Sequence, residues 1–578
     1  MKTNQLYPST HFSNLKEVMQ YATNTYPNHT AFIIKHKVAE KVDYENITFQ
    51  KFGEEVEALG TSLIALGLKN KRIAIISPNR YEWCSSYLAV VNGVGIVVPL
   101  DKSLPDTELE SLLKRSGADA VIFDQKYSDV MKQMQIKATT SVRHYICMDT
   151  VQQIDGFLQY SDLVNKGSKM ISQGHRGYRD AKIDNDKMSI ILFTSGTTSL
   201  SKAVMLSHRN IAENIYALNC AEKIYDTDIS LAFLPFHHTF GCTGFLFFMS
   251  KGAATAFCDG IRHIPQNLKE YKISVFVCVP LLLETMYKRI YQEIEKQGKA
   301  RLIKIAKVGT NLLAKIGIDI RRKVFKQIID QLGGNLRFIV SGAAAIDKQV
   351  AKGFNEFGIK TVQGYGLTET SPVLCAENDK CIRYGSVGLP LANVQIQIDH
   401  PNEQGIGEIK AKGPNVMLGY YEEPEATKQV LKDGWFYTGD LGYMDKQGFI
   451  YITGRKKNVI VLKNGKNIYP EELEVLINNL PYVAESMVFG YPKQEDLMVS
   501  AKIVYQKEYV QELLGDLSKD QLTEKIWQDI KQINQKLVGY KHIKKIIVAE
   551  EPMIKTTTQK IKRFEEIKKI TSMKEETD

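Results

Sequence analysis

The sequence lacks the apolar segments and the cysteine pairs that mark several common classes of protein. No run in its 578 residues approaches the roughly 20 apolar residues of a membrane span, and Met1 to Pro8 contain no apolar core of a secretory signal. The eight cysteines form no Cys-x-x-Cys pair and stand mostly in apolar runs, which is typical of reduced core thiols rather than of a metal cluster. These absences predict a soluble cytoplasmic protein, and a length of 578 residues predicts more than one domain.

The sequence carries a net charge of +10, much of it in two segments, residues 288–326 and 541–569. In the first segment, apolar residues recur at helical spacing: Leu302, Ile305, Leu312, Leu313 and Ile316. Two interpretations stay open, a solvated helix face or a basic amphipathic helix that makes peripheral contact with anionic lipid. The basic residues lack interleaved aromatics, so nucleic-acid binding is not expected.

Short β-branched runs alternate with helical segments from about residue 72 to residue 357. The pattern predicts strands over 73–76, 95–98, 120–123, 229–234, 275–279 and 336–340, with helices such as 82–91 and 107–115. This alternation is typical of an α/β domain of parallel-rich sheets and helices, in which ligands bind at the carboxyl edge of the strands.

The pattern changes after about residue 442. Strands are predicted over 449–452, 459–462, 483–489, 498–504 and 543–549, with a helix opened by Pro470 and a long polar helix over 522–537. We therefore expect a large N-terminal domain, residues 1–456, and a small mobile α+β domain, residues 457–578. The polar break at residues 455–458 is the predicted hinge.

Residues 191–204, Ile-Leu-Phe-Thr-Ser-Gly-Thr-Thr-Ser-Leu-Ser-Lys-Ala-Val, offer a turn suited to phosphate. A strand over 188–193 leads into hydroxyl side chains, backbone N–H groups opened by Gly196, and the charge of Lys202. The nucleotide-triphosphatase loop is excluded, because Ser201 stands where its second glycine belongs and Ala203 where its magnesium hydroxyl belongs. Taken alone, the segment fits a phosphate site and an ordinary Ser/Thr/Gly turn equally well.

Taken in order, this segment and seven others resemble the adenylate-forming superfamily, which includes acyl-CoA synthetases, and most closely its long-chain fatty acid:CoA ligases. The resemblance covers nearly the whole chain. The motifs are Phe193-Thr-Ser-Gly-Thr-Thr, Leu234-Pro-Phe-His-His-Thr-Phe-Gly241, Ser341-Gly-Ala-Ala, Gly364-Tyr-Gly-Leu-Thr-Glu369, Trp435-Phe-Tyr-Thr-Gly-Asp440, Gly454-Arg455, Asn464-Gly-Lys-Asn-Ile-Tyr-Pro-Glu471 and Lys555-Thr-Thr-Thr-Gln-Lys560.

The resemblance implies a two-step ligase that uses ATP, Mg²⁺ and CoA. A carboxylate reacts with ATP to give acyl-AMP and pyrophosphate, and a thiol then displaces AMP. Lys560 matches the family's catalytic lysine, and Lys202 belongs to the pyrophosphate-handling loop. Glu369 is the expected magnesium ligand, and Thr368 is expected to bind the phosphates. Positioned charges and donors of this kind lower the barrier as charge builds on the phosphates.

The resemblance also assigns a nucleotide site and a thiol channel. Asp440 and Arg455 are expected at the ribose, the ring of Tyr365 along the adenine, Lys457 at the pivot of the small domain and Gly465 in the pantetheine channel. The remaining expected nucleotide contacts are Thr194, Ser195, Gly196, Thr197, Thr198, Ser341, Gly342, Ala343, Gly364 and Gly366.

The resemblance places His238 at the mouth of the acyl pocket, with His237 beside it as a competing candidate; neither shows metal-ligand spacing. Residues 236–248 contain no acidic residue to pair with an amino-acid substrate, so a fatty or other apolar carboxylate is favoured. Two alternatives stay open: an acceptor thiol on acyl carrier protein, or a regulatory protein that binds ATP and acyl groups without turnover. At four positions the sequence departs from the residues that are usual in this family: Ser199, Ser201, Ala203 and Gln559. These departures predict an altered rate rather than an inactive enzyme.

Overall fold

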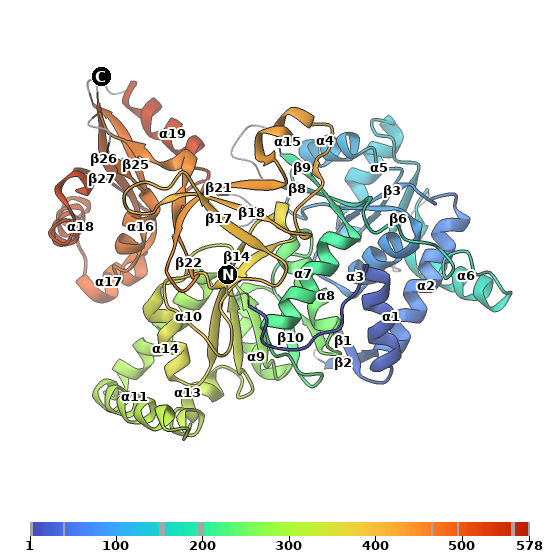
Figure 1. Cartoon of the computed structure of the whole chain (residues 1–578), viewed down its shortest axis with the longest axis horizontal. Helices are drawn as coiled ribbons and strands as arrows, with labels where there is room; N and C mark the ends of the chain where they lie inside the picture. The colour runs from blue at the N-terminus through green and yellow to red at the C-terminus, as the bar shows by residue number, and fades with distance from the viewer. Residues whose placement is uncertain are drawn as a thin grey trace.

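Two large sheets with mainly parallel inner strands, together with the helices around them, form most of the molecule (Figure 1). The computed structural model describes residues 4–38, 41–149, 156–194, 201–463, 466–493, 496–555 and 561–575. In Figure 1 the N-terminal half lies to the right, and the strands and helices nearest the C-terminus form a smaller unit at the upper left.

One large sheet has eight strands in the order β19-β9-β8-β4-β3-β5-β6-β7. Its inner strands β3, β4, β5 and β8 pair in parallel, while β9 and β19 add antiparallel strands at one edge. After Arg72, the β3 strand is a continuous buried run of isoleucine and alanine, as expected for a parallel strand covered on both faces. The bounds are β3 Arg72–Ile76, β4 Ile96–Pro99, β5 Ala120–Phe123, β6 His144–Cys147, β7 Leu158–Gln159, β8 Met188–Thr194, β9 Lys202–Ser207 and β19 Gly419–Tyr420.

The second large sheet has nine strands in the order β16-β15-β14-β13-β12-β10-β11-β1-β2. The run from β14 to β1 is parallel, and antiparallel strands close both ends. The bounds are β1 Thr30–Val38, β2 Lys41–Thr48, β10 Ile229–Ala232, β11 Ala254–Phe257, β12 Val275–Cys278, β13 Phe338–Ser341, β14 Lys360–Gly366, β15 Val373–Ala376 and β16 Leu389–Pro390. The predicted α/β fold with parallel-rich sheets is confirmed.

Helices connect and cover these strands. Pro280 opens α10, where its missing N–H costs no hydrogen bond, and Ser207 caps α7 in a reciprocal capping box with Asn210. The helices are α1 Leu15–Thr25, α2 Phe49–Ala65, α3 Tyr81–Ala89, α4 Asp106–Ser116, α5 Ser128–Lys137, α6 Tyr160–Ser172, α7 His208–Ala221, α8 Thr239–Met249, α9 Ile264–Glu270, α10 Pro280–Lys296, α11 Ala300–Lys315, α12 Arg321–Val324, α13 Lys326–Gln331, α14 Lys348–Glu356 and α15 Pro424–Val430. Among the described residues, no helix is both long enough and apolar enough to cross a membrane.

A five-stranded antiparallel sheet follows, and it corrects the expected change of pattern near residue 442. The β22 strand pairs with β21 and brings Asp440 opposite Arg455, so this sheet continues to Arg455. Backbone pairing, which the local composition does not reveal, therefore extends the sheet past the apparent break. The bounds are β17 Gln395–Asp399, β18 Gly407–Lys412, β20 Leu431–Lys432, β21 Trp435–Met444 and β22 Ile450–Arg455.

The C-terminal unit combines two small sheets with helices around a separate apolar cluster. The predicted strand over 543–549 is present as β27 but does not close the chain, because α19 follows it. The bounds are β23 Ile460–Val461, β24 Asn467–Ile468, α16 Pro470–Asn478, β25 Val483–Lys493, β26 Asp496–Tyr505, α17 Lys507–Leu514, α18 Lys519–Asn534, β27 Lys545–Ala549 and α19 Arg563–Glu575.

Candidate active site

Three of the predicted nucleotide residues form one hydrogen-bonded group. The Tyr365 phenol in β14 donates to Asp440 Oδ2 at 2.7 Å, and Arg455 Nε lies 2.6 Å from Asp440 Oδ1. Burial, together with the adjacent Asp440 carboxylate, raises the pKa of Tyr365, so its phenol stays protonated and donates. Both Asp440 oxygens thus have a protein partner, and ribose hydroxyls would use their remaining lone pairs or displace those partners.

The predicted purine loop follows β13. Ser341 is fully buried, and its hydroxyl has no hydrogen-bond partner among the described residues. Gly342 is packed so closely that an added Cβ would lie 2.7 Å from the Phe240 ring. Ala343 is exposed and has a φ of 71°, which is unusual for a residue other than glycine. The Ser341 hydroxyl can therefore bond to a polar ligand, and Gly342 lets a planar ligand approach the backbone closely. Both features fit the predicted purine loop.

The phosphate-side residues are brought together by a tyrosine that the sequence did not single out. Thr194 and Lys202 face each other across the β8–β9 pair. The Lys202 ammonium lies 4.5 Å from the centre of the Tyr420 ring, and the Tyr420 hydroxyl donates to Glu369 Oε1 at 2.9 Å. Burial and the Glu369 charge raise the pKa of Tyr420, which keeps it a donor. One tyrosine therefore links the predicted phosphate lysine to the predicted magnesium ligand.

Glu369 lies in a short 3-10 helix, Thr368–Thr370, directly after β14. At Gly366 an added Cβ would lie 1.8 Å from the Pro372 carbonyl oxygen, so only glycine fits there, whereas at Gly364 the nearest atom is 3.4 Å away. The Glu369 carbonyl accepts from Met417 N at 2.8 Å. These contacts fix the position of Glu369 relative to β14 and β19.

Several predicted site residues lie outside the described residues: Ser195, Gly196, Thr197, Thr198, Gly465 and Lys560, together with the departures Ser199 and Gln559. Of the other two departures, Ser201 accepts a hydrogen bond from Arg115 through its carbonyl. Ala203 lies within β9, where its side chain is buried and its carbonyl accepts from Tyr421 N. Ala203 is therefore a strand residue that packs in the core.

A small apolar cavity lies along one face of α8. Phe240, Gly244 and Phe248 follow at intervals of four residues and line a cavity with β10 and β12. No charged side chain lines this cavity. Its volume is about 20 Å³, room for about one water molecule, so an acyl chain requires the lining aromatic rings to move.

His237 and His238 stand at the start of α8, next to an aspartate from the other large sheet. His237 Nε2 lies 3.3 Å from Asp101 Oδ1, and the two histidine rings are 4.3 Å apart. Asp101, His237 and His238 bring one ligand atom each to within 4.8 Å of one another, a grouping that sequence spacing did not reveal. The buried His237 thus lies beside Asp101 without a hydrogen bond to its Nε2 from any described residue, while His238 is partly exposed.

The predicted pivot follows the last strand of the five-stranded sheet. Lys457 lies in a short 3-10 turn, Lys456–Asn458, between β22 and β23. The Glu471 carboxylate from the start of α16 accepts from Asn458 Nδ2 at 2.6 Å, and an added Cβ on Gly454 would meet that carboxylate at 2.5 Å. Glu471 of α16, which follows the turn in the chain, thus contacts the turn through Asn458.

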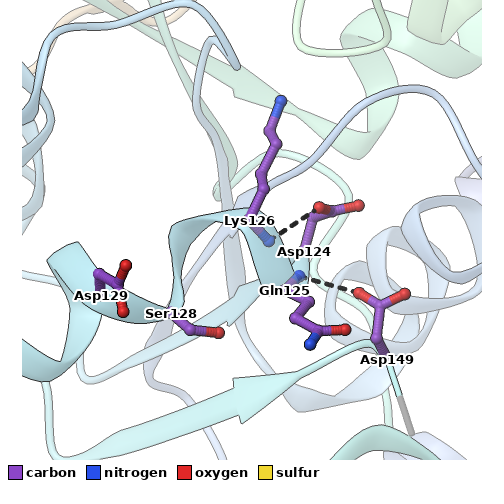
Figure 2. Close-up of a pocket in the computed structure, with 6 residues that line it drawn as sticks. All are labelled: Asp124, Gln125, Lys126, Ser128, Asp129 and Asp149. Atoms are coloured by element: carbon purple, nitrogen blue, oxygen red, sulfur yellow. Dashed lines mark hydrogen bonds between the residues drawn. The ribbon is translucent and has the colours of Figure 1, made fainter. Parts of the chain in front are cut away.

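A larger polar depression lies elsewhere and contains none of the predicted site residues (Figure 2). Asp124, Gln125, Lys126, Ser128, Asp129 and Asp149 line it. Arg80 Nη1 bridges Asp124 and Asp149, so two of its acids serve an internal ion pair. We therefore locate the candidate active site at the β14, β9 and α8 elements.

Comparison with known proteins supplies the family. A model described as "AMP-binding enzyme" matches residues 19–421, and one described as "AMP-binding enzyme C-terminal domain" matches residues 457–577. The chain belongs to the AMP-binding enzyme family. Among its relatives, the long-chain-fatty-acid–CoA ligase 5 of Mus musculus is 30% identical, over 90% of this chain and 82% of the relative.

One further relative of this AMP-binding enzyme concerns the thiol acceptor, and one solved structure concerns the fold. The chloroplastic long-chain-fatty-acid–[acyl-carrier-protein] ligase AEE15 of Arabidopsis thaliana is 26% identical, over 89% of this chain and 80% of the relative. The crystal structure of the anthranilate CoA ligase AuaEII with anthranoyl-AMP aligns with a TM-score of 0.75 at 19% identity, covering 96% and 97% of the two chains. The solved structure supports the fold alone.

Two site residues of this AMP-binding enzyme were missed from sequence, for one reason. Asp101 follows β4, and Tyr420 belongs to the two-residue strand β19, so each reaches the site only through sheet pairing. The available signal for Tyr420 was its place in the aromatic pair Tyr420-Tyr421 after Gly419, which resembles many surface turns.

Proposed function

We propose that this protein is an AMP-forming fatty acid:CoA ligase. The proposal rests above all on the position of α8, which contacts both nucleotide loops. Its Phe240 packs against Gly342 of the predicted purine loop, and its Thr243 donates to the Ser371 carbonyl at 3.1 Å, directly after the turn that bears Glu369. The same helix lines the apolar cavity. An acid bound along α8 would therefore present its carboxylate beside the predicted phosphate residues.

Each group has a proposed task in the first step. Lys202 and Lys560 bear the positive charge that the phosphates need as pyrophosphate leaves, and Thr368 donates to them. Asp440, Arg455 and Tyr365 hold the ribose and adenine, and Ser341, Gly342 and Ala343 let the purine edge approach closely. His238 directly precedes α8, at the end of the helix where the carboxylate of the bound acid is proposed to lie. Ser195, Gly196, Thr197 and Thr198 are proposed to complete the phosphate contacts.

Glu369 fits a magnesium ion, because it is a carboxylate on the phosphate side of the site with one oxygen already held in place by Tyr420. Magnesium would neutralise charge on the transferring phosphates. The protein's own contribution is to fix the direction of Glu369 through Tyr420 and through the backbone contact with Met417.

The proposed second step uses the small domain, residues 457–578. A rotation at Lys457 withdraws Lys560 and brings the segment of Gly465 to line a channel for the thiol arm. Lys457 lies in the short turn after β22, where few residues would absorb such a rotation. All eight cysteines are free, and six of them are buried, which accords with work in the reducing cytoplasm.

Pyrophosphate release tests the proposal. Purified protein with ATP and Mg²⁺ should release pyrophosphate only when an apolar acid is added, and should form a thioester when CoA follows. A panel from short to long saturated acids, with an amino acid and an aryl acid as controls, defines the substrate. Absence of pyrophosphate and thioester across the whole panel would contradict the proposal.

Two alternatives are separated by the same assay. The Arabidopsis relative named as an acyl-carrier-protein ligase favours testing carrier protein against CoA as the acceptor. A regulatory protein that binds ATP and acyl groups would bind both without turnover. Lys560→Ala should abolish adenylation in an enzyme, whereas a binding protein would show no turnover in either form and unchanged ligand affinity.

A further inference from the structure

The amphipathic helix α11 (Ala300–Lys315) is turned with a row of apolar side chains outward. Leu302, Ile305 and Leu312 are 63%, 71% and 59% exposed, whereas Lys307 and Thr310 are only 8% and 3% exposed. With 3.6 residues per turn, the exposed residues fall on one side of the helix and Lys307 and Thr310 on the other. Ile303 and Ala306 pack against the core from the inner side, so α11 carries apolar side chains on both sides, and the outer row is unusual for a surface helix.

Polar contacts fix this orientation. The Lys307 ammonium lies 3.1 Å from Glu356 Oε2, donates to the Tyr291 hydroxyl at 2.7 Å, and sits 4.2 Å from the centre of the Phe357 ring. Thr310 donates to a carbonyl within the helix. Lys307 thus attaches α11 to α10 and α14 through a buried charge pair, and rotating the helix to bury its apolar face would break that pair.

The apolar stripe continues past the helix. Val308 lies within it, and Ile316 and Ile318 extend it beyond the last turn; all three are exposed. Isolated exposed apolar residues are ordinary, but a contiguous stripe marks an interaction surface. In Figure 1, α11 lies at the lower left edge of the molecule, away from the C-terminal unit.

The charge around the stripe selects the partner. The sequence carries ten Lys or Arg residues and a single Asp between Lys296 and Lys326. On α11 itself, Arg301, Lys304 and Lys315 are exposed and make no ion pair with any residue that the structure describes. An apolar stripe bordered by unpaired cations matches an anionic lipid surface, where the apolar side chains enter the acyl boundary and the cations meet the headgroups.

We propose that α11 docks this protein onto an anionic membrane surface, through Leu302, Ile305, Val308, Leu312 and Ile316 with Arg301, Lys304 and Lys315. The contact is peripheral and independent of catalysis. It would bring α10 next to the lipid, and α10 directly follows β12, whose Val277 lines the apolar cavity. The basic helix is thereby a lipid-facing element rather than a solvated one.

Vesicle binding by the full chain, without ATP or acid, tests this directly. Cosedimentation compares vesicles of phosphatidylcholine alone with vesicles containing about 30% phosphatidylglycerol, at low and high salt. The protein should bind the anionic vesicles and lose most of that binding at high salt. Equal binding to both vesicle types, or no binding to either, would overturn the proposal whatever the catalytic assay shows.

Substitutions on α11 test whether this helix is the surface that binds the vesicles. Leu302→Ser, Ile305→Ser and Leu312→Ser combined should weaken anionic-vesicle binding at least about tenfold, since most of the apolar stripe is removed. Arg301→Gln, Lys304→Gln and Lys315→Gln combined should remove the preference for anionic lipid. The matched control, Ile136→Ser, replaces an equally exposed residue on α5 and should bind like the parent.

A second copy of the chain is the competing occupant of this stripe. Analytical ultracentrifugation without lipid distinguishes it, since the membrane proposal expects the same mass for the parent and the triple serine variant. A parent dimer that the serine variant abolishes would overturn the proposal, as would a triple serine variant that is folded by circular dichroism and still binds vesicles like the parent.

Discussion

Tyr365 donates its phenolic hydrogen bond to Asp440, at 2.7 Å, across 75 positions of the chain. The pair joins the end of a parallel strand, β14, to an antiparallel strand of another sheet, β21. Because Arg455 holds the other oxygen of Asp440, the carboxylate has a fixed direction before any nucleotide binds. A nucleotide site that is ordered in advance loses less entropy on binding.

Removing the Tyr365 hydroxyl tests this arrangement. Tyr365→Phe keeps the ring that is proposed to lie along the adenine but frees one Asp440 oxygen, so the KM for ATP should rise about tenfold, or about 1.4 kcal/mol. Initial rates of pyrophosphate release at varied ATP measure it. Tyr443→Phe is the control, since Tyr443 lies in β21 with Asp440 but stacks on Tyr451 instead, and an equal effect there would contradict the role of the pair.

The Tyr420 hydroxyl is predicted to act through Glu369. In Tyr420→Phe the carboxylate loses the donor that orients it, so the Mg²⁺ concentration for half-maximal rate should rise about three- to tenfold. Titration of Mg²⁺ at saturating ATP and acid measures the change. Tyr421→Phe is a matched control, because the Tyr421 hydroxyl contacts Arg72 instead of Glu369. An unchanged Mg²⁺ requirement in Tyr420→Phe would remove the proposed link.

Gly244 offers a test of the acyl cavity. It lines the cavity, and an added Cβ would meet no atom within 4 Å, so the side chain of Gly244→Val starts in open space and its methyl groups occupy room that an acyl chain needs. The ratio of palmitate to octanoate turnover should fall at least about tenfold.

Its neighbour on the same helix supplies the contrast. Gly241 also lines the cavity, but an added Cβ there would lie 2.3 Å from the Pro235 carbonyl oxygen, so Gly241→Ala should lower the Tm and affect both acids equally. If Gly244→Val changes palmitate and octanoate turnover by the same factor, the cavity is not the acyl site.

Glu377 gives the stability of this fold a pH dependence. Burial raises its pKa to about 8, although the backbone N–H groups of Gln363 and Arg383 donate to it. Because the folded pKa lies above the unfolded value of 4.5, the folded state binds the extra proton. The contribution to stability is therefore complete below about pH 4.5 and is lost as the pH rises through about 8.

Thermal unfolding of a Glu377→Gln variant isolates this contribution. The variant has no titrating group at the position, so between about pH 6 and about pH 9 its Tm should fall less than that of the parent. The variant's absolute Tm is expected to be lower at both values, because its amide cannot accept both backbone hydrogen bonds. Parallel Tm profiles for the two proteins would show that Glu377 does not titrate in this range.

The sequence predicted much of the fold because its strongest signals are local. The buried run over 73–76 and the strand over 188–193 appear as β3 and β8 within a residue of the expected ends. Pairing was harder to predict. The apparent break after residue 442 lies inside a sheet, because β22 pairs back onto β21 through backbone hydrogen bonds that leave no mark on composition.

The candidate site shows the same division. Tyr365, Asp440, Arg455 and Glu369 were identified through the resemblance of their motifs to the adenylate-forming superfamily, and the structure brings the first three into contact. The links between the predicted groups were not foreseen. Tyr420 joins Lys202 to Glu369, and Asp101 lies beside His237, through strands that are adjacent only after folding.

By itself, the sequence determined the alternation of strands and helices and the order of the chemical motifs, since periodicity and residue type are properties of short segments. It also determined that α11 would be basic and amphipathic. Only the tertiary structure decided which way α11 faces, because that depends on Lys307 meeting Glu356 and Tyr291 from other helices. Long-range contacts of this kind also determine the small volume of the apolar cavity beside α8. They likewise bring Tyr365 and Arg455 to the two oxygens of Asp440.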